Sequence, residues 1–298
     1  MLDYIKKIFK KKTTPYIEVE TTPLSEDQLR SVSFEQIKLH PLQYIVGSGQ
    51  STGLQRDHNE DAIFVMSSTL ADGNSDVPVG VFIIADGMGG HLNGEIASGV
   101  AARMMARAIL SRLYLKVLDP ENEPMEESLQ EVMEHGIHDA QRAVMRNAPG
   151  GGTTMTAALV IGEQVTIAHV GDSRAYFVYP DGRMQRVTKD HSLVQRMVEL
   201  EEITEDEAKT HPHRNVLLRA IGQMEPYRPD IQTHQIPRQG RMLLCSDGLW
   251  SVVPENEIFR IVNGGSNLSM VCQSLVEAAN NAGGPDNISV IVVEFAGF

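Results

Sequence analysis

Short turns between apolar strands constrain the fold of this chain more than any other feature of its sequence. The segment 153–188 reads TTMTAALVIGEQVTIAHVGDSRAYFVYPDGRMQRVT. Apolar residues alternate along its first part as in a strand, at Met155, Ala157, Leu159 and Ile161. The dipeptide GE (162–163) and the tripeptide PDG (180–182) are turn signals. Strands joined by such short turns must be antiparallel, which excludes a doubly wound parallel sheet.

Further strands and helices are expected on both sides of this segment. Apolar runs predict strands at 43–46, 62–66, 79–84, 241–245 and 287–295. Apolar residues at helical spacing, or a polar composition that favours helix, predict helices over 95–116, 124–146, 190–210, 255–263 and 267–282. The sequence therefore predicts an α+β domain whose antiparallel sheets are covered by helices.

Charge and cysteine content narrow the classes of protein to which the chain can belong. A net charge of −13 and a pI of about 5.2 argue against nucleic acid as a general partner. The two cysteines, Cys245 and Cys272, lack CxxC spacing, which argues against a zinc site and fits a reducing cytosol. No apolar run reaches the length of a membrane span, and no signal peptide is visible. We therefore expect a cytoplasmic protein.

Residues 1–42 differ in character from the rest of the chain. They contain several prolines and little sustained periodicity, which predicts a tail or linker with one short helix near 25–31. The segment MLDYIKKIFKKK carries five lysines, and its apolar residues recur at helical spacing. Such a segment can lie on an anionic membrane surface. A solvated tail is the preferred interpretation, because so short a helix is marginal in water.

An acid stands at the end of the most apolar strand. Asp86 ends VFIIAD and is followed by Gly87, Gly89 and Gly90. These glycines leave room for another group to approach the backbone. Taken alone, the stretch ADGMGGHLNGE favours a tight turn in which Asp86 caps the next helix.

The same pattern recurs at other strands. Asp247 ends MLLCSD, Asp286 lies in GGPDN before the last strand, and Glu60 and Asp61 precede AIFVM. If these acids converge, they repel one another strongly unless a multivalent cation lies among them. An all-oxygen donor set favours Mg²⁺ or Mn²⁺ over Zn²⁺.

Such a site favours hydrolysis at phosphorus. Two metal ions about 3.5–4 Å apart can share a water, lower its pKa and stabilise an in-line displacement. A phosphate substrate also needs a planar, permanently charged donor, and Arg56 lies five residues before Asp61.

An ordered set of motifs carries a resemblance to a known family. RDHNEDA, ADGMGGHLNGE, GGTTMTAALV, AHVGDSRAY, KDHSLV, SDGLW and GPDNISVIVV occur in this order over 43–298. Together they resemble the metal-dependent protein phosphatases of the PP2C type, in their bacterial form. The resemblance implies a central antiparallel β-sandwich flanked by helices on both faces, with two Mn²⁺ or Mg²⁺ ions in a cleft at one end. It also implies hydrolysis of phosphoserine and phosphothreonine in proteins.

The resemblance assigns roles to particular residues. Asp86 would bridge the two metal ions, and Asp247 and Asp286 would complete the first site. The Gly87 carbonyl and the pair Glu60–Asp61 would serve the second site. Arg56 would hold the substrate phosphate. His91 has two open interpretations, as proton donor to the leaving oxygen or as a residue that only shapes its loop.

Other residues of these motifs receive structural interpretations. The segment 190–222 matches the region that forms a flap beside the cleft in this family, and its histidines are expected at the surface, at His191, His211 and His213. His169 is interpreted as a satisfied structural histidine. Asp172 and Arg174 of GDSR are expected to pair with each other.

The chain departs from the family at a third metal position. Many bacterial relatives have one aspartate just before the Gly-Thr-Thr stretch and another four residues after the aspartate of Ser-Asp-Gly. Here these places hold Gly150 and Ser251. A glycine and a hydroxyl offset the desolvation of Mg²⁺ poorly. We therefore expect two metal ions at rest and only weak binding of a third.

Two other functions stay open from the sequence alone. One is a two-metal hydrolase of another phosphate ester, and the other is a regulatory binding module that retains the fold. The complete acid set argues against the binding module. We expect a monomer that acts on phosphorylated proteins and opposes a serine/threonine kinase.

Overall fold

Two antiparallel β-sheets face each other in the computed structural model, which describes residues 41–71, 76–89, 92–119, 127–223 and 228–297. The first sheet has the order β1 (Gln43–Ser51), β11 (Ile288–Ala296), β10 (Arg241–Cys245), β7 (Arg174–Val178) and β8 (Met184–Arg186). The second has the order β2 (Asp61–Ala71), β3 (Asp76–Met88), β5 (Met155–Ile161), β6 (Gln164–Val170) and β9 (Asp230–Gln235). The short strand β4 (Gly152–Thr153) pairs with the end of β3.

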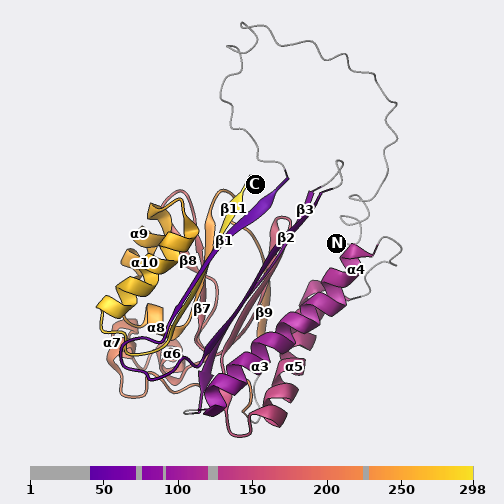
Figure 1. The fold of residues 1–298 in the computed structure, drawn as a ribbon. Coiled ribbons are helices and arrows are strands. Elements are labelled where there is room, and N and C mark those ends of the chain that lie inside the picture. The colour runs from indigo at the N-terminus through magenta and orange to yellow at the C-terminus, as the bar shows by residue number, and fades with distance from the viewer. Residues whose placement is uncertain (1–40, 72–75, 90–91, 120–126, 224–227, 298) are drawn as a thin grey trace, which may run out of the picture.

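Helices cover the outer face of each sheet, which gives four layers (Figure 1). The second sheet is covered by α3 (Leu92–Ile109), a π-helical turn (Leu110–Tyr114), α4 (Leu115–Leu118) and α5 (Leu129–Asn147). The first is covered by α8 (Asp247–Trp250), α9 (Glu255–Gly264) and α10 (Leu268–Asn281). Two short helices, α6 (Leu193–Glu199) and α7 (Glu205–Thr210), lie in the connection between β8 and β9.

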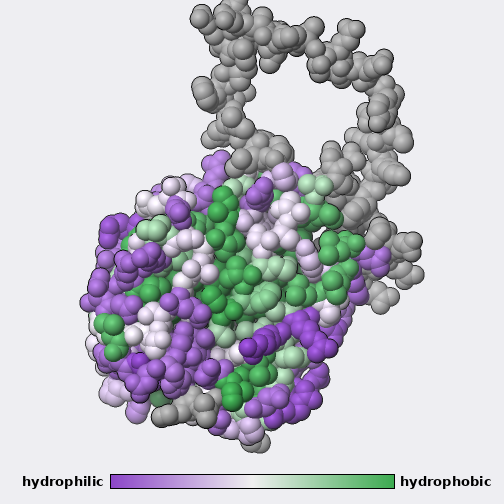
Figure 2. Space-filling model, viewed as in Figure 1, coloured by the Kyte–Doolittle hydropathy of each residue, from purple (hydrophilic) through white to green (hydrophobic). Residues whose placement is uncertain are grey.

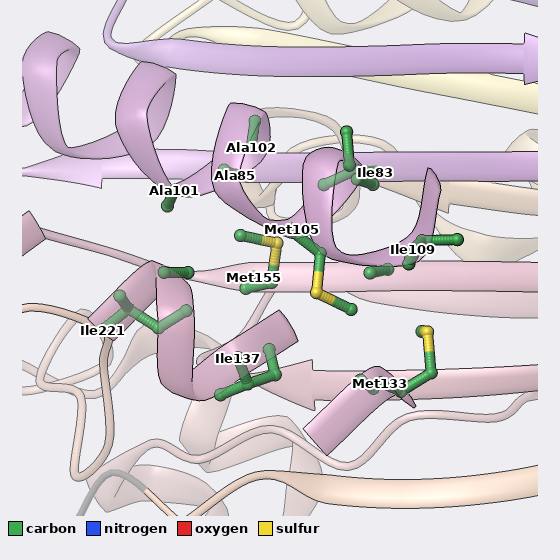
Figure 3. Packing of buried hydrophobic residues seen from close by; sticks show 14 of the residues in the cluster. Ile83, Ala85, Ala101, Ala102, Met105, Ile109, Met133, Ile137, Met155 and Ile221 are labelled. Atoms are coloured by element: carbon green, nitrogen blue, oxygen red, sulfur yellow. The ribbon is translucent and has the colours of Figure 1, made fainter. Parts of the chain in front are cut away.

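Three apolar clusters hold the layers together. Alternate residues of β3 point to opposite faces, as in any strand. Phe82 and Ile84 pack between the two sheets, whereas Ile83 packs toward α3 and α5. Met105, Ile109, Met133, Ile137 and Met155 belong to the same cluster on that side of the sheet (Figure 3). The third cluster joins β10 and β11 to α9 and α10. Burial on both faces accounts for the continuous apolar run at the centre of β3.

The expected α+β architecture is confirmed. The turn at 162–163 joins the antiparallel pair β5 and β6, and the turn at 180–182 joins β7 and β8. The helices expected over 255–263 and 267–282 are α9 and α10. A side chain caps the first turn of α10, because Asn267 accepts hydrogen bonds from the Ser269 and Met270 N–H groups.

The structure corrects several boundaries. The strand expected over 79–84 continues to Met88, because Gly87 and Met88 pair with Thr153 and Gly152 of β4. Asp86 therefore lies within the strand and not at its end. The helix expected over 190–210 is broken into α6 and α7, with Glu201 at φ 58° between them. Strand β9 was not predicted, because its sequence DIQTHQ is polar and lies at a sheet edge.

Apolar side chains gather over β1 and β2 in the middle of the face shown in Figure 2. Ile45, Val65 and Leu70 of these two strands are among the exposed apolar residues. Within the described ranges, no helix is long and apolar enough to cross a membrane. Residues 1–40 lie outside the described residues. They include nearly all of the tail expected over 1–42 and the short helix expected at 25–31.

Candidate active site

Four aspartates on or beside strands of the two sheets lie close to one another. Asp61 is the first residue of β2, and Asp86 lies directly opposite it in the register of β3. Asp247 begins α8 immediately after β10, and Asp286 lies just before β11. Because like charges opposite each other destabilise a strand pair, this register is unfavourable unless something neutralises the two carboxylates.

The pKa values show that these carboxylates are close neighbours. Burial raises the pKa of Asp86 well above its ordinary value, and repulsion from Asp61 and Asp247 raises it further. Burial also raises the pKa of Asp61 to about 7, with repulsion from Asp247 and Asp286 acting in the same direction. The pKa of Asp247 rises to about 6, first through burial and then through Asp286. These four carboxylates are therefore close enough to repel one another, which is the condition under which the sequence predicts a cation among them.

Hydrogen bonds fix the orientations of two of these carboxylates. The Ser246 hydroxyl donates to Asp61 Oδ2 over 2.9 Å, and Asp61 Oδ1 is buried without a hydrogen-bond partner among the described residues. Arg56 Nη2 donates to Asp286 Oδ2 over 2.7 Å. Across the described part of the chain, no three Asp, Glu, His or Cys side chains already have an arrangement that holds a metal ion. The carboxylates of Asp61 and Asp286 are thus turned toward other partners, Ser246 and Arg56.

The backbone around Asp86 is held by two threonines. Asp86 N–H donates to Thr154 Oγ1 over 3.0 Å. The Asp86 carbonyl accepts from Thr154 N–H over 2.8 Å and from the Thr153 hydroxyl over 2.9 Å. The stretch GGTT therefore positions Asp86. Sequence reasoning did not assign this role to the threonines, because it depends on the pairing of β3 with β4.

Asn287 was also missed as a site residue. Its Nδ2 donates to the carbonyls of Thr52 and His58, each over 2.9 Å, and its Oδ1 accepts from Glu60 N–H over 2.8 Å. One side chain thus holds the whole loop between β1 and β2, which carries Arg56 and Glu60. The only signal in the sequence is the amide that follows Asp286 in GPDN.

Gly87 lies where no larger residue fits. Its N–H donates to the Glu60 carbonyl over 3.2 Å. A Cβ at this position would lie 2.3 Å from the Gly94 carbonyl oxygen and 2.5 Å from that of Glu60. Glu60 Oε1 lies 3.2 Å from His58 Nε2. Gly87 and Glu60 are therefore adjacent, as the motif assignment requires.

Arg56 lies at the rim of the acidic group. Its side chain is 50% exposed, and the hydrogen bond with Asp286 raises its pKa above the ordinary value. A half-exposed guanidinium held by Asp286, near Glu60 and Asp247, is suited to meet an anionic group that enters from solvent. His91, the other predicted catalytic residue, lies outside the described residues.

The two departures at the third metal position are visible in the structure. Gly150 has φ +82°, and a Cβ built there would meet nothing within 4 Å. Ser251 follows α8 and is exposed. The structure also places Asp172, which was expected from the sequence to pair with Arg174, in the interior near Asp247. Burial and repulsion from Asp247 raise the pKa of Asp172 well above its ordinary value.

The expected pair of Asp172 and Arg174 is wrong. Arg174 instead binds Asp190, with Nη2 at 2.7 Å from Oδ2. The surface position expected for His191 is also wrong, because its side chain is buried and its Nε2 lies 3.1 Å from Asp230 Oδ2.

The expectation for His169 is confirmed. Its Nδ1 lies 2.9 Å from Thr156 Oγ1 and its Nε2 lies 3.1 Å from the Lys189 carbonyl. Burial, aided by repulsion from His191, lowers its pKa to about 4, so the ring is neutral near pH 7. Of the other two flap histidines, His213 is exposed and His211 is partly exposed, so only His213 lies fully at the surface as expected.

Fold and site together define a class of protein. Two facing antiparallel sheets with helices outside, and an acidic group at one end beside an arginine, match the architecture that the motifs imply for metal-dependent protein phosphatases.

Comparison with known proteins agrees with this class. The family model described as protein phosphatase 2C matches residues 45–288. The serine/threonine phosphatase stp of Listeria innocua is 36% identical over 244 residues, which cover 81% of this chain and 92% of that protein. The chain belongs to the protein phosphatase 2C family.

Solved structures share the fold. The crystal structure of the Mycobacterium tuberculosis serine/threonine phosphatase PstP/Ppp has a TM-score of 0.71 and 28% identity, covering 86% of this chain and 100% of that one. A structure of the catalytic domain of the serine/threonine protein phosphatase PstP, in complex with two manganese ions, has a TM-score of 0.67 and 29% identity. It covers 85% of this chain and 98% of that one.

Proposed function

We propose that this protein hydrolyses phosphoserine and phosphothreonine in other proteins and that it requires two divalent cations, Mn²⁺ or Mg²⁺. The observation that carries the proposal is the meeting of Asp61, Asp86, Asp247 and Asp286 beside Arg56 in a member of the protein phosphatase 2C family. Relatives named serine/threonine phosphatases support the substrate class.

The residues of the site fit divalent cations. Every proposed donor is an oxygen, which suits hard cations. Asp61 Oδ1 is a buried oxygen without a hydrogen-bond partner in the described structure, and a cation would satisfy it. We assign Asp86, Asp247 and Asp286 to one ion, and Asp86, the Gly87 carbonyl, Glu60 and Asp61 to the other. When bound, such cations polarise phosphoryl oxygens and lower the pKa of water.

The chain's own groups supply binding and orientation. Arg56 binds the substrate phosphate, and the bond to Asp286 keeps its guanidinium at the rim of the site. Thr153 and Thr154 keep Asp86 in one orientation. We propose His91 as the proton donor to the seryl or threonyl oxygen that leaves.

Phosphate release in the presence and absence of metal tests this function. The full chain is assayed on a phosphothreonine peptide and on a phosphodiester, with Mn²⁺, with Mg²⁺ and with a chelator. We expect release from the peptide only when a divalent cation is present. Turnover that persists in chelator would contradict the proposal, and faster turnover of the diester would favour the alternative phosphate-ester hydrolase.

Removal of Arg56 should weaken substrate binding and leave metal binding intact. A charge-assisted hydrogen bond contributes about 1.5–3 kcal/mol, so Arg56→Ala is expected to raise KM for the peptide by roughly 10- to 100-fold. The Mn²⁺ dissociation constant should not rise, because the variant removes a cation from an acidic site. Steady-state kinetics and calorimetric metal titration measure the two constants. Weaker metal binding at unchanged KM would show that the assigned role is wrong.

Residues 43–298 are proposed as the catalytic domain, and the family match over 45–288 supports this division. A truncation that begins at Leu42 should keep its kcat on a small phosphate ester within about two-fold of the full chain, because every proposed site residue is retained. A folded truncation without activity would contradict the division.

The remaining partner assignments are also proposals. We propose that the protein acts as a cytoplasmic monomer and opposes a serine/threonine kinase. Membrane contact by its N-terminal segment is proposed to be weak at most. Its net charge of −13 supports the absence of nucleic-acid partners.

A further inference from the structure

A buried arginine links two segments behind the acidic group. Arg174 is the first residue of β7, and its side chain is only 13% exposed. Its Nε lies 3.1 Å from Asp190 Oδ1 and its Nη2 lies 2.7 Å from Asp190 Oδ2. The guanidinium carbon also lies 3.5 Å from the centre of the Trp250 ring system. One planar group therefore forms a two-point ion pair and a cation–π contact at the same time.

Trp250 connects this arginine to the acidic site. It is the last residue of α8, the single helical turn that begins at Asp247. Its indole Nε1–H donates to the Asp172 carbonyl over 3.0 Å. The ring is thus fixed at its edge by Asp172 and on its face by Arg174. A shift of this ring would move both the turn that carries Asp247 and the backbone of Asp172.

The turn that contains Asp172 and Arg174 is held by the start of the segment 190–222. His191 N–H donates to the Gly171 carbonyl over 2.7 Å, and Gly171 N–H donates to His191 Nδ1 over 3.2 Å. Asp190 and His191 therefore hold both ends of the turn 171–174. This arrangement leaves Arg174 little freedom, which is the condition for positioning another residue accurately.

Lysine cannot replace arginine in this arrangement. An ammonium group is a point charge, so it cannot bind both Asp190 oxygens in one plane and stack on an indole. The substitution Arg174→Lys keeps the charge that the buried Asp190 needs and removes only the planar geometry. This variant therefore tests the orientation of the Arg174 side chain separately from its neutralisation of the Asp190 charge.

We propose that Arg174 is a positioning residue of the metal centre, which acts on the Asp247 turn through Trp250. The inference rests on the proposed function, because it assumes that Asp247 binds a cation. Residues that orient metal ligands change metal affinity by about 10- to 100-fold when they are mutated. We expect a change of at least ten-fold for Arg174→Lys.

The chain contains its own probe for the test. Trp250 is the only tryptophan, so the intrinsic tryptophan fluorescence of the full chain reports on this position. Wild type and Arg174→Lys are titrated with manganese chloride, followed by fluorescence and by calorimetry. We expect the Mn²⁺ dissociation constant to rise at least ten-fold and KM for the phosphothreonine peptide to stay within about two-fold, because Arg56 is untouched.

A matched control is available on the neighbouring hairpin. Arg183 binds Asp181 over 2.7 Å and lies 4.5 Å from the centre of the Tyr179 ring, in an exposed position. Arg183→Lys removes the same kind of contacts away from the acidic group. Its Mn²⁺ affinity should equal that of wild type.

The outcomes distinguish this inference from the proposed function. If Arg174→Lys melts at a lower temperature but binds Mn²⁺ as wild type does, its role is structural only and the inference is overturned. If Arg174→Lys does not fold, Mn²⁺ binding by Trp250→Phe is measured instead by calorimetry. Phenylalanine keeps an aromatic ring but loses the N–H group that donates to Asp172. Weaker Mn²⁺ binding by that variant supports the inference, and unchanged binding overturns it. Wild-type protein that binds no Mn²⁺ overturns the proposed function itself.

Discussion

Asp86→Asn is expected to lower kcat on a phosphothreonine peptide by at least a thousand-fold. Asp86 lies opposite Asp61 in the strand register, and its carboxylate is the one that we assign to both cations. Asparagine keeps the volume and the backbone bonds to Thr153 and Thr154, but it removes the negative charge. A loss of about 4 kcal/mol of transition-state stabilisation corresponds to a thousand-fold lower rate. Steady-state phosphate release at saturating Mn²⁺ measures the change.

A second aspartate on the same strand serves as the control. Asp76 is the first residue of β3, at the end of the strand opposite to the acidic group. Asp76→Asn should keep its activity within about two-fold of wild type. If Asp86→Asn retained more than a tenth of the wild-type kcat while folded, Asp86 would not be the shared ligand.

Asp61→Asn is expected to make the metal-free protein more stable and much less active. The pKa of Asp61 is about 7 in the folded protein, above its ordinary value of 3.8. As the pH rises from about 4 to about 7, the unfolded chain loses this proton before the folded chain does. The folded state binds more protons in that window, so the free energy of unfolding falls as the pH rises. Asparagine removes this loss, and we expect about 4 kcal/mol of added stability at pH 7.

Denaturant unfolding in chelator, between pH 4.5 and pH 7.5, measures this difference. The stability gap between Asp61→Asn and wild type should be smallest at the acid end and grow toward neutral pH. Added Mn²⁺ should reverse the order, because only the wild type keeps the full donor set, and kcat of the variant should be at least a hundred-fold lower. A gap that does not change with pH would contradict the assigned pKa. Asp76→Asn again provides the control.

Local pattern is sufficient to predict the apolar strands and the acids on or beside them. Each acid lies next to an apolar run that has to be a strand, so the pattern alone assigns Asp86, Asp247 and Asp286 to one kind of position. Their meeting at one end depends on the pairing of β2 with β3 and of β10 with β11, and the two predicted turns join neither of these pairs.

Contacts between distant segments could not be predicted in the same way. Arg174 was expected to bind Asp172, two residues away, but it binds Asp190 across the hairpin formed by β7 and β8. Asn287 holds the loop before β2 from more than 200 positions away, and nothing in either segment indicates that contact. Strand β9 is polar and half-exposed, so its place in the sheet is decided by the neighbouring strand β6.

The position of β11 has a consequence for protein synthesis. This strand, Ile288–Ala296, lies between β1 and β10 in the first sheet. Strand β1 is synthesised first, and it has no hydrogen-bonded neighbour in this sheet until residues 288–296 have left the ribosome. Asp286 and Asn287, which complete the acidic site and its loop, emerge only just before it. We therefore expect a nascent chain to have no phosphatase activity during translation, and a chain clipped before residue 286 to stay inactive toward phosphoproteins.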